Sequence, residues 1–169
     1  MMEKTEYAWK IKEYLIQNIQ FADYKAGVII ALCTLNIGLF SILPDKLSTV
    51  EYVVLVISFI PILVSLFLAI RCVQPRLTST STNIIFWEYT ANYKSYDEYK
   101  NAFIASDKLE EVLKQIFDLS KIASQKYKSI SLSITWHKFG LVTFWIVIFL
   151  IKSGLLPNLI SNVCTSLSL

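Results

Sequence analysis

The sequence predicts an all-α membrane protein with three transmembrane helices, and three observations support this fold class. The 169 residues are 54% hydrophobic and only 17% charged, whereas about a quarter of a typical soluble domain is charged. Two uncharged runs, Ala26 to Pro44 and Tyr52 to Ile70, each contain 19 residues, close to the roughly 20 that cross a bilayer. Most lysines and arginines also lie before the first run or after the second, and two antiparallel spans would place both segments on one side of a membrane.

The first 25 residues carry apolar side chains at helical spacing, namely Tyr7, Ile11, Leu15, Ile19 and Ala22. No proline interrupts this segment, so we expect residues 1–25 to form a cytosolic amphipathic helix that continues into a first span over 26–44. The short link after Pro44 makes the second span, 52–71, its antiparallel neighbour.

Residues 72–138 are predicted to form a cytosolic helical region. Aromatic residues at three- and four-residue intervals predict a helix over about 83–104. Ser106 or Asp107 can cap the next helix, and Glu110 stands three residues after Asp107, which is typical of a helix start. A third long helix is therefore expected over about 107–152. Extensions of the first and third spans, together with the 83–104 helix, would form a cytosolic bundle.

The third span is predicted over 139–157, with Lys152 reaching the membrane surface and 158–169 forming an extracytoplasmic tail. Three residues are expected to mark its opposite end: Trp136, His137 and Lys138. Of 16 lysines and arginines, 14 lie within 1–25 or 71–138. The positive-inside rule then places the N-terminus in the cytoplasm and the C-terminus outside.

Other function classes find little support. The net charge of +3 does not indicate nucleic-acid binding. Neither a phosphate-binding glycine loop, a metal-ligand spacing nor a cysteine–histidine pair at usable spacing is visible, so we expect a non-enzyme without metal or cofactor. The single histidine, His137, is interpreted as structural, and Cys33 and Cys72 as small apolar filling.

The predicted spans lack ionisable residues near their centres, which argues against proton-coupled transport. They do contain five polar residues: Thr34, Asn36, Ser58, Ser65 and Thr143. These could line a pore or bond across helices, and the second interpretation is favoured. Because three spans cannot enclose a useful channel, a pore would require a homo-oligomer.

Several strings occur in a fixed order around the spans: Ala22-Asp23-Tyr24-Lys25-Ala26, Gln74-Pro75-Arg76-Leu77, Asn83-Ile84-Ile85-Phe86-Trp87 and Ile122-Ala123-Ser124-Gln125-Lys126-Tyr127. In this order the chain, over roughly residues 9–151, resembles the transmembrane effector family of Pycsar anti-phage systems. The resemblance implies a bacterial inner-membrane protein and a partner pyrimidine cyclase that makes cyclic CMP or cyclic UMP after infection. The effector would sense this nucleotide and impair the lipid bilayer, causing abortive infection.

A cyclic mononucleotide presents one negative charge and a flat base. The candidates are Arg76 and Lys25 for the phosphate, Phe86 and Trp87 for stacking, and Asn83 and Asp23 for the base or ribose. Plainer interpretations stay open. Asp23 and Lys25 could pair with other charges and fix the depth of the first helix, Arg76 could anchor at lipid headgroups, and the two aromatic residues could be core or interfacial belt.

Two alternative functions are also kept. The chain could be a membrane-anchored scaffold that recruits a cytosolic partner. It could equally be the same type of effector triggered by a cyclic oligonucleotide.

Overall fold

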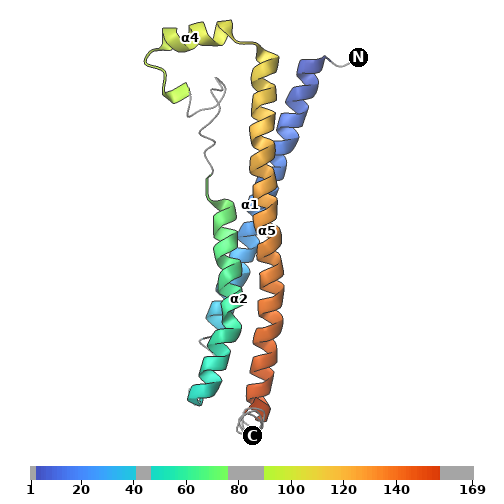
Figure 1. Ribbon diagram of the computed structural model, residues 1–169, viewed down its shortest axis with the longest axis vertical. Helices are drawn as coiled ribbons and strands as arrows, with labels where there is room; N and C mark the ends of the chain where they lie inside the picture. Colours follow the sequence, from blue (N-terminus) through green and yellow to red (C-terminus); the bar gives the residue numbers. More distant parts are fainter. Residues whose placement is uncertain (1–2, 41–46, 76–89, 157–169) are drawn as a thin grey trace, which may run out of the picture. The chain divides into compact units, whose positions relative to one another are not determined.

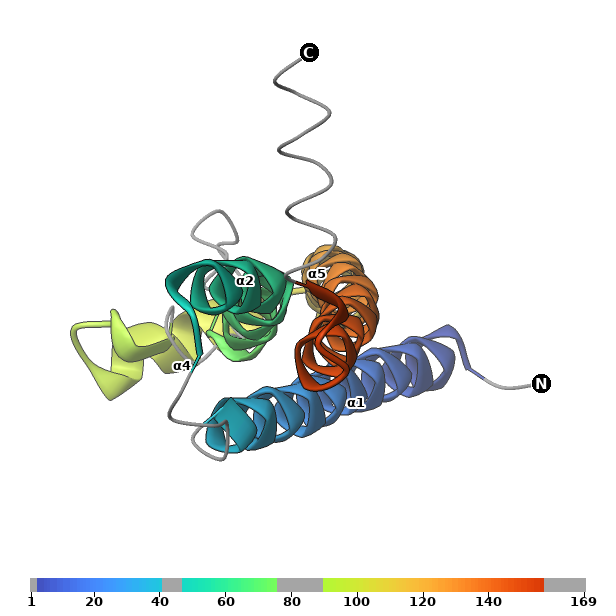
Figure 2. The same cartoon turned by 90° about the horizontal axis from the view of Figure 1, so that it is seen from below.

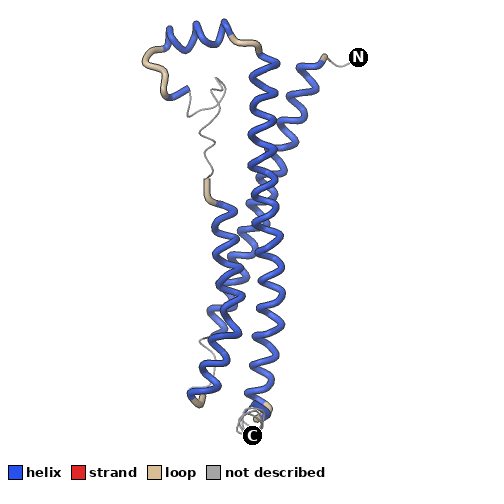
Figure 3. The backbone as a smooth tube through the Cα atoms, viewed as in Figure 1, coloured by secondary structure: helices blue, strands red, loops and turns tan. Residues whose placement is uncertain are grey.

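The computed structural model describes residues 3–40, 47–75 and 90–156, and these residues form helices and short loop segments, with no strand among them (Figure 3). The helices are α1 (Lys4–Phe40), α2 (Thr49–Val73), α4 (Tyr96–Ala105) and α5 (Lys108–Lys152). Helices α1, α2 and α5 are long and apolar enough to cross a membrane. The expected all-α class and its three candidate spans are therefore confirmed.

Helices α2 and α5 begin at the side-chain caps that their sequences offer. At the start of α2, the Ser48 amide donates to the Glu51 carboxylate at 2.8 Å, and the Glu51 amide donates back to the Ser48 hydroxyl at 3.4 Å. This reciprocal pair satisfies two amides that a helix start leaves free. At the start of α5, the Leu109 amide donates to the Asp107 carboxylate at 2.9 Å. The predicted cap at Asp107 is thus confirmed.

The prediction of one continuous helix over 83–104 is wrong at residues 92–95. Residues 83–89 lie outside the described residues, but residues 92–95 form a turn and α4 begins only at Tyr96. The Ser95 hydroxyl accepts from the Glu98 amide at 3.2 Å, while the Glu98 carboxylate accepts from the Lys94 amide at 3.1 Å. The helix therefore starts at Tyr96 and not earlier, because a serine three residues before a glutamate stabilises a helix start.

The chain divides into two compact units. Unit 1 comprises Met1–Tyr24 and Val73–Lys128, and unit 2 comprises Lys25–Cys72 and Ser129–Leu169. Helices α1 and α5 each contribute residues to both units without an interruption in the helix. Figures 1 and 2 show the unit 2 segments of α1, α2 and α5 side by side.

Buried residues of the three long helices recur with alternating spacings of three and four. They are Ala22, Ala26, Ile29, Cys33 and Asn36 on α1; Leu55, Ser58, Ile62, Ser65, Ala69 and Cys72 on α2; and Ala123, Lys126, Ile130, Ser133, His137, Gly140 and Phe144 on α5. A seven-residue repeat of this kind is typical of nearly parallel helices whose side chains interlock. Leu55, Ile62 and Phe144 are completely buried and fill the interior of unit 2.

Two serines join α2 to α5 in unit 2. The Ser65 hydroxyl donates to the Ser133 carbonyl at 2.8 Å, and the Ser133 hydroxyl donates to the Ser65 carbonyl at 2.7 Å. Both serines are completely buried. The reciprocal bonds fix the register of the two helices, since a shift along either axis would break both.

Replacing Ser65 with alanine is expected to lower the free energy of unfolding in detergent by about 1 kcal/mol, a typical upper range for a hydrogen bond between membrane helices. Ser58→Ala is the matched control, because the Ser58 hydroxyl donates to Leu55 of its own helix. Thermal unfolding followed by circular dichroism measures both. Equal losses in the two variants would contradict an interhelical role for Ser65.

Candidate functional site

The polar residues of the predicted spans divide into two groups. The expected bonding across helices is confirmed for Ser65, as above, and for Thr143, whose hydroxyl lies 3.4 Å from the Ser58 carbonyl of α2. Thr143 is also within 3.1 Å of two carbonyls of its own helix. Among the described residues, the other polar side chains bond within their own helices: Thr34 to Ile30, Asn36 to Leu32 and Ser58 to Leu55.

A cysteine–histidine pair lies inside unit 2. Cys33 Sγ is 3.4 Å from His137 Nδ1, 3.7 Å from the Ile62 carbonyl and 3.9 Å from the Ser65 hydroxyl. The sequence shows no cysteine–histidine pair at usable spacing, since 104 residues separate the two, and the fold brings them together. Cys33 belongs to the buried core, as expected, and also contacts this histidine. Its thiol is completely buried, so a substrate cannot reach it in this packing.

His137 lies opposite the middle of α2 rather than its end. Cys33 links it to Ile62 and Ser65, and Ile62 stands near the centre of the uncharged run from Tyr52 to Ile70. The histidine is 4% exposed, and its Nε2 atom is buried without a hydrogen-bond partner among the described residues. The sequence predicted His137 at a membrane surface because the longest apolar run of α5 starts only at Phe139.

In unit 1, Asp23 of α1 forms an ion pair and hydrogen bond with Lys126 of α5. The lysine side chain is 6% exposed and the aspartate side chain 34%. Burying an ammonium requires a partner of opposite charge. The plainer interpretation of Asp23, that it pairs with another charge, is therefore confirmed.

A second contact lies beside this ion pair. The Tyr127 hydroxyl donates to the Asn18 side-chain oxygen at 3.3 Å. Ala22 and Ala123 are both buried at this level, 0% and 8% exposed. The structure thus brings together two strings that the sequence analysis noted separately, Ala22-Asp23 and Ala123…Lys126-Tyr127. Sequence reasoning did not identify Lys126, although the string that contains it was noted.

Of the remaining predicted ligand residues, only Lys25 lies within the described residues. Lys25 lies half-buried in unit 2 and takes part in further interactions. Arg76, Asn83, Phe86 and Trp87 lie outside the described residues. The structure therefore neither assembles nor separates the predicted nucleotide site.

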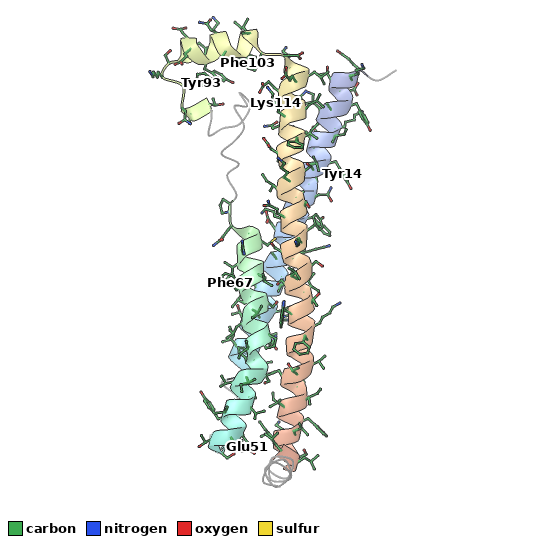
Figure 4. All side chains as sticks on the ribbon, in the orientation of Figure 1. Tyr14, Glu51, Phe67, Tyr93, Phe103 and Lys114 are labelled. Atoms are coloured by element: carbon green, nitrogen blue, oxygen red, sulfur yellow. The ribbon has the colours of Figure 1, made fainter. Side chains whose placement is uncertain are left out.

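Part of the aromatic segment is ordered around α4. The Tyr93 and Tyr99 rings meet edge to face with centroids 5.5 Å apart, and Phe103 follows 6.1 Å from Tyr99 (Figure 4). None of the residues of α4 is buried. Tyr99 and Phe103 lie on α4, whereas Tyr93 lies in the turn before it, so these rings form a half-exposed aromatic contact between the turn and the helix.

The first turns of α5 carry charges. Lys114 lies 3.1 Å from Glu110 and 3.4 Å from Glu111, and the hydrogen bond to Glu110 raises the pKa of Lys114. Within the described ranges, no cluster of three or more histidine, cysteine or acidic residues could hold a metal ion. In both units the polar contacts described above thus join neighbouring helices or lie within one helix.

Comparison with known proteins agrees with this architecture. The family model of the Pycsar effector protein domain matches residues 7–152. The chain is similar to the Pycsar effector protein SaPycTM of Staphylococcus aureus, with 33% identity over 134 residues, which cover 76% of this chain and 84% of the relative. No solved structure matches the chain. The matched region contains α2, α4, α5 and nearly all of α1, so the chain belongs to the Pycsar effector family of anti-phage defence proteins.

Proposed function

We propose that this protein senses cyclic CMP or cyclic UMP, made by a partner pyrimidine cyclase after phage infection, and then impairs the bacterial inner membrane. The family supports a defence effector, and three helices are long and apolar enough to span a bilayer. The observation that carries the proposal is the continuity of α1 and α5. Each helix contains a segment rich in charges and an apolar segment without a break between them.

Continuous helices offer a physical route from ligand to membrane. A ligand changes a conformational equilibrium only by its differential affinity for the two states. If the nucleotide favours one packing of the charged segments, the same rigid helices carry a rotation or shift into the spans. Helices with interlocked side chains are suited to carrying such a rotation or shift, because packed interfaces switch between discrete arrangements.

The nucleotide site proposed here combines Arg76 and Lys25 for the phosphate, Phe86 and Trp87 for stacking, and Asn83 for the base edge. Asp23, whose side chain is 34% exposed, is proposed to contact the nucleotide while it stays paired with Lys126. Arginine supplies two parallel donors to a phosphate, and aromatic rings stack on any base.

Membrane impairment is proposed to need several copies. The interior of unit 2 is occupied by side chains such as Leu55, Ile62 and Phe144, which are completely buried. Water and ions would therefore pass between copies of the chain and not through one copy. The excess of lysine and arginine within 1–25 and 71–138 supports a cytoplasmic N-terminus.

Cells that express this protein with a pyrimidine cyclase are expected to lose inner-membrane potential, as measured with a potential-sensitive dye. Arg76→Ala and Trp87→Ala should each abolish the loss. The controls are Lys100→Ala and Tyr96→Ala, which remove an equal charge and an exposed aromatic ring from α4. An unchanged potential in wild-type cells that contain the nucleotide would refute the proposal.

Isothermal titration of the detergent-solubilised protein with a nucleotide panel identifies the trigger. Binding of cyclic CMP or cyclic UMP alone supports the proposal. Binding of a cyclic oligonucleotide instead would favour the alternative trigger with the same effector plan.

A further inference from the structure

We infer that α2 contains a hinge at Pro61, about which residues 49–60 swing away from α5 while residues 62–72 keep their place. The inference rests on the proposed function, because it names the movement within the spans that a bound nucleotide would favour. Pro61 lies inside α2 and is buried in unit 2. No other proline occurs within α1, α2 or α5. A hinge in one long helix is therefore expected in α2.

Proline weakens the backbone of α2 at this point and sets the direction of a bend. Its nitrogen carries no hydrogen, so Pro61 cannot donate to the carbonyl of Ile57, four residues earlier, and its ring crowds that carbonyl. The crowding pushes the two apart, so the helix opens on the side of the proline and bends away from it. Pro61 faces α5, because a Cβ atom placed on Gly140 would lie 3.2 Å from Pro61 Cβ. The bend therefore moves one half of α2 away from α5.

The pivot lies where α2 and α5 approach each other closely. Gly140 has no side chain, and a Cβ atom placed there would lie 3.0 Å from the Ile62 backbone nitrogen. The two backbones are thus packed directly against each other beside the proline. A contact of this kind can stay in place while the chain on one side of it turns, which is what a hinge requires.

The second half of α2, residues 62–72, is held by both of its neighbours in unit 2. The hydroxyls of Ser65 and Ser133 of α5 each donate to the carbonyl of the other residue, at 2.8 and 2.7 Å. Cys33 of α1 places its Sγ atom 3.7 Å from the Ile62 carbonyl and 3.9 Å from the Ser65 hydroxyl. Movement of this half would break two full hydrogen bonds between helices.

The first half, residues 49–60, is held to α5 by weaker contacts. The Thr143 hydroxyl lies 3.4 Å from the Ser58 carbonyl, but it is also 3.1 Å from two carbonyls of its own helix. One hydroxyl hydrogen cannot serve three acceptors fully, so this bond is easily given up. Phe59 and Phe144 meet edge to face with ring centroids 5.7 Å apart, a contact without a fixed register. The first half is therefore the one that moves.

Distances between pairs of spin labels on the full-length protein in liposomes test the hinge without any nucleotide. One pair, at Val53 and Ile146, reports the first half of α2, and a second pair, at Phe67 and Leu132, reports the second half. All four side chains are exposed, and the native cysteines are replaced by serine. The distance distribution of the first pair is expected to be about twice as wide as that of the second. Equal widths would overturn the inference.

Two substitutions in α2 connect this width to the proline. Pro61→Ala restores the backbone donor to Ile57 and is expected to narrow the distribution of the first pair to the width of the second. Ile60→Ala is the matched control, because it shortens a side chain at the same level and adds no backbone donor. A first-pair distribution that stays wide in Pro61→Ala, or that narrows equally in Ile60→Ala, would contradict a hinge at the proline.

Release of a fluorescent solute from liposomes on addition of cyclic CMP or cyclic UMP measures what the hinge does. Pro61→Ala is expected to slow this release about tenfold, because a straight helix keeps its first half on α5. Ile60→Ala should release solute at the wild-type rate. An undiminished rate in Pro61→Ala would overturn the role of the hinge in activation. Absence of release from the wild-type protein would refute the proposed function, while the label distances would still decide whether α2 bends at Pro61.

Discussion

Asp23→Ala is expected to lower the free energy of unfolding by about 3 kcal/mol, because it leaves a buried ammonium without its partner. The Lys126 side chain is 6% exposed, so water cannot replace the lost carboxylate. Lys126→Met should be milder, at about 1 kcal/mol, since the Asp23 side chain is 34% exposed and can be hydrated when its partner is removed. Unfolding of the detergent-solubilised protein, followed by circular dichroism, measures both losses.

The control for this pair is Glu6→Ala. Glu6 lies 3.0 Å from Lys10 on the same helix, but both side chains are more than half exposed. An exposed pair of this kind contributes only about 0.5 kcal/mol. The double variant Asp23→Ala with Lys126→Met should recover part of the loss, because neither charge is then left alone. A loss in Asp23→Ala no larger than in Glu6→Ala would contradict the assigned role of the ion pair.

Gly140→Ala is expected to destabilise unit 2 by about 1 to 3 kcal/mol, the usual range for an added methyl group in a packed interior. The new Cβ would lie 2.7 Å from Ile62 Cγ1 and 3.0 Å from the Ile62 backbone nitrogen. The Ile62 side chain can turn away, but the backbone of α2 can move only with the whole helix. Helices α2 and α5 must therefore separate at this point.

Gly27→Ala and Gly38→Ala are matched controls for this substitution. A Cβ at either position meets nothing within 4 Å. Alanine favours a helix over glycine by about 1 kcal/mol, so these variants should be neutral or more stable. Melting temperatures in detergent distinguish the three, and a rise for Gly140→Ala equal to that of Gly38→Ala would show that the helices do not approach closely at Gly140.

The helices themselves could be predicted from the sequence because each depends on local patterns. Uncharged runs of sufficient length identified the regions of α1 and α2, and Asp107 with Glu110 identified the start of α5 to within one residue. The start of α4 was missed although its signal was present. Ser95 and Glu98 have the spacing of a helix cap, and the aromatic repeat was given more weight than this pair.

Contacts between helices could not be predicted from one sequence. Asp23 and Lys126 are 103 residues apart, and Cys33 and His137 are 104 residues apart. Their meeting depends on the rotation and register of each helix, which the seven-residue seam and the Ser65–Ser133 bonds determine jointly. The contact of His137 with Cys33, opposite Ile62 and Ser65 of α2, could not be predicted for the same reason.

We propose that a cyclic pyrimidine nucleotide makes this protein permeabilise a bilayer. The most direct test uses the purified protein in liposomes that contain a small fluorescent solute. Addition of cyclic CMP or cyclic UMP is expected to release the solute, whereas cyclic AMP or linear CMP should not. Release that is the same with and without the cyclic pyrimidine nucleotide, or no release in its presence, would contradict the account.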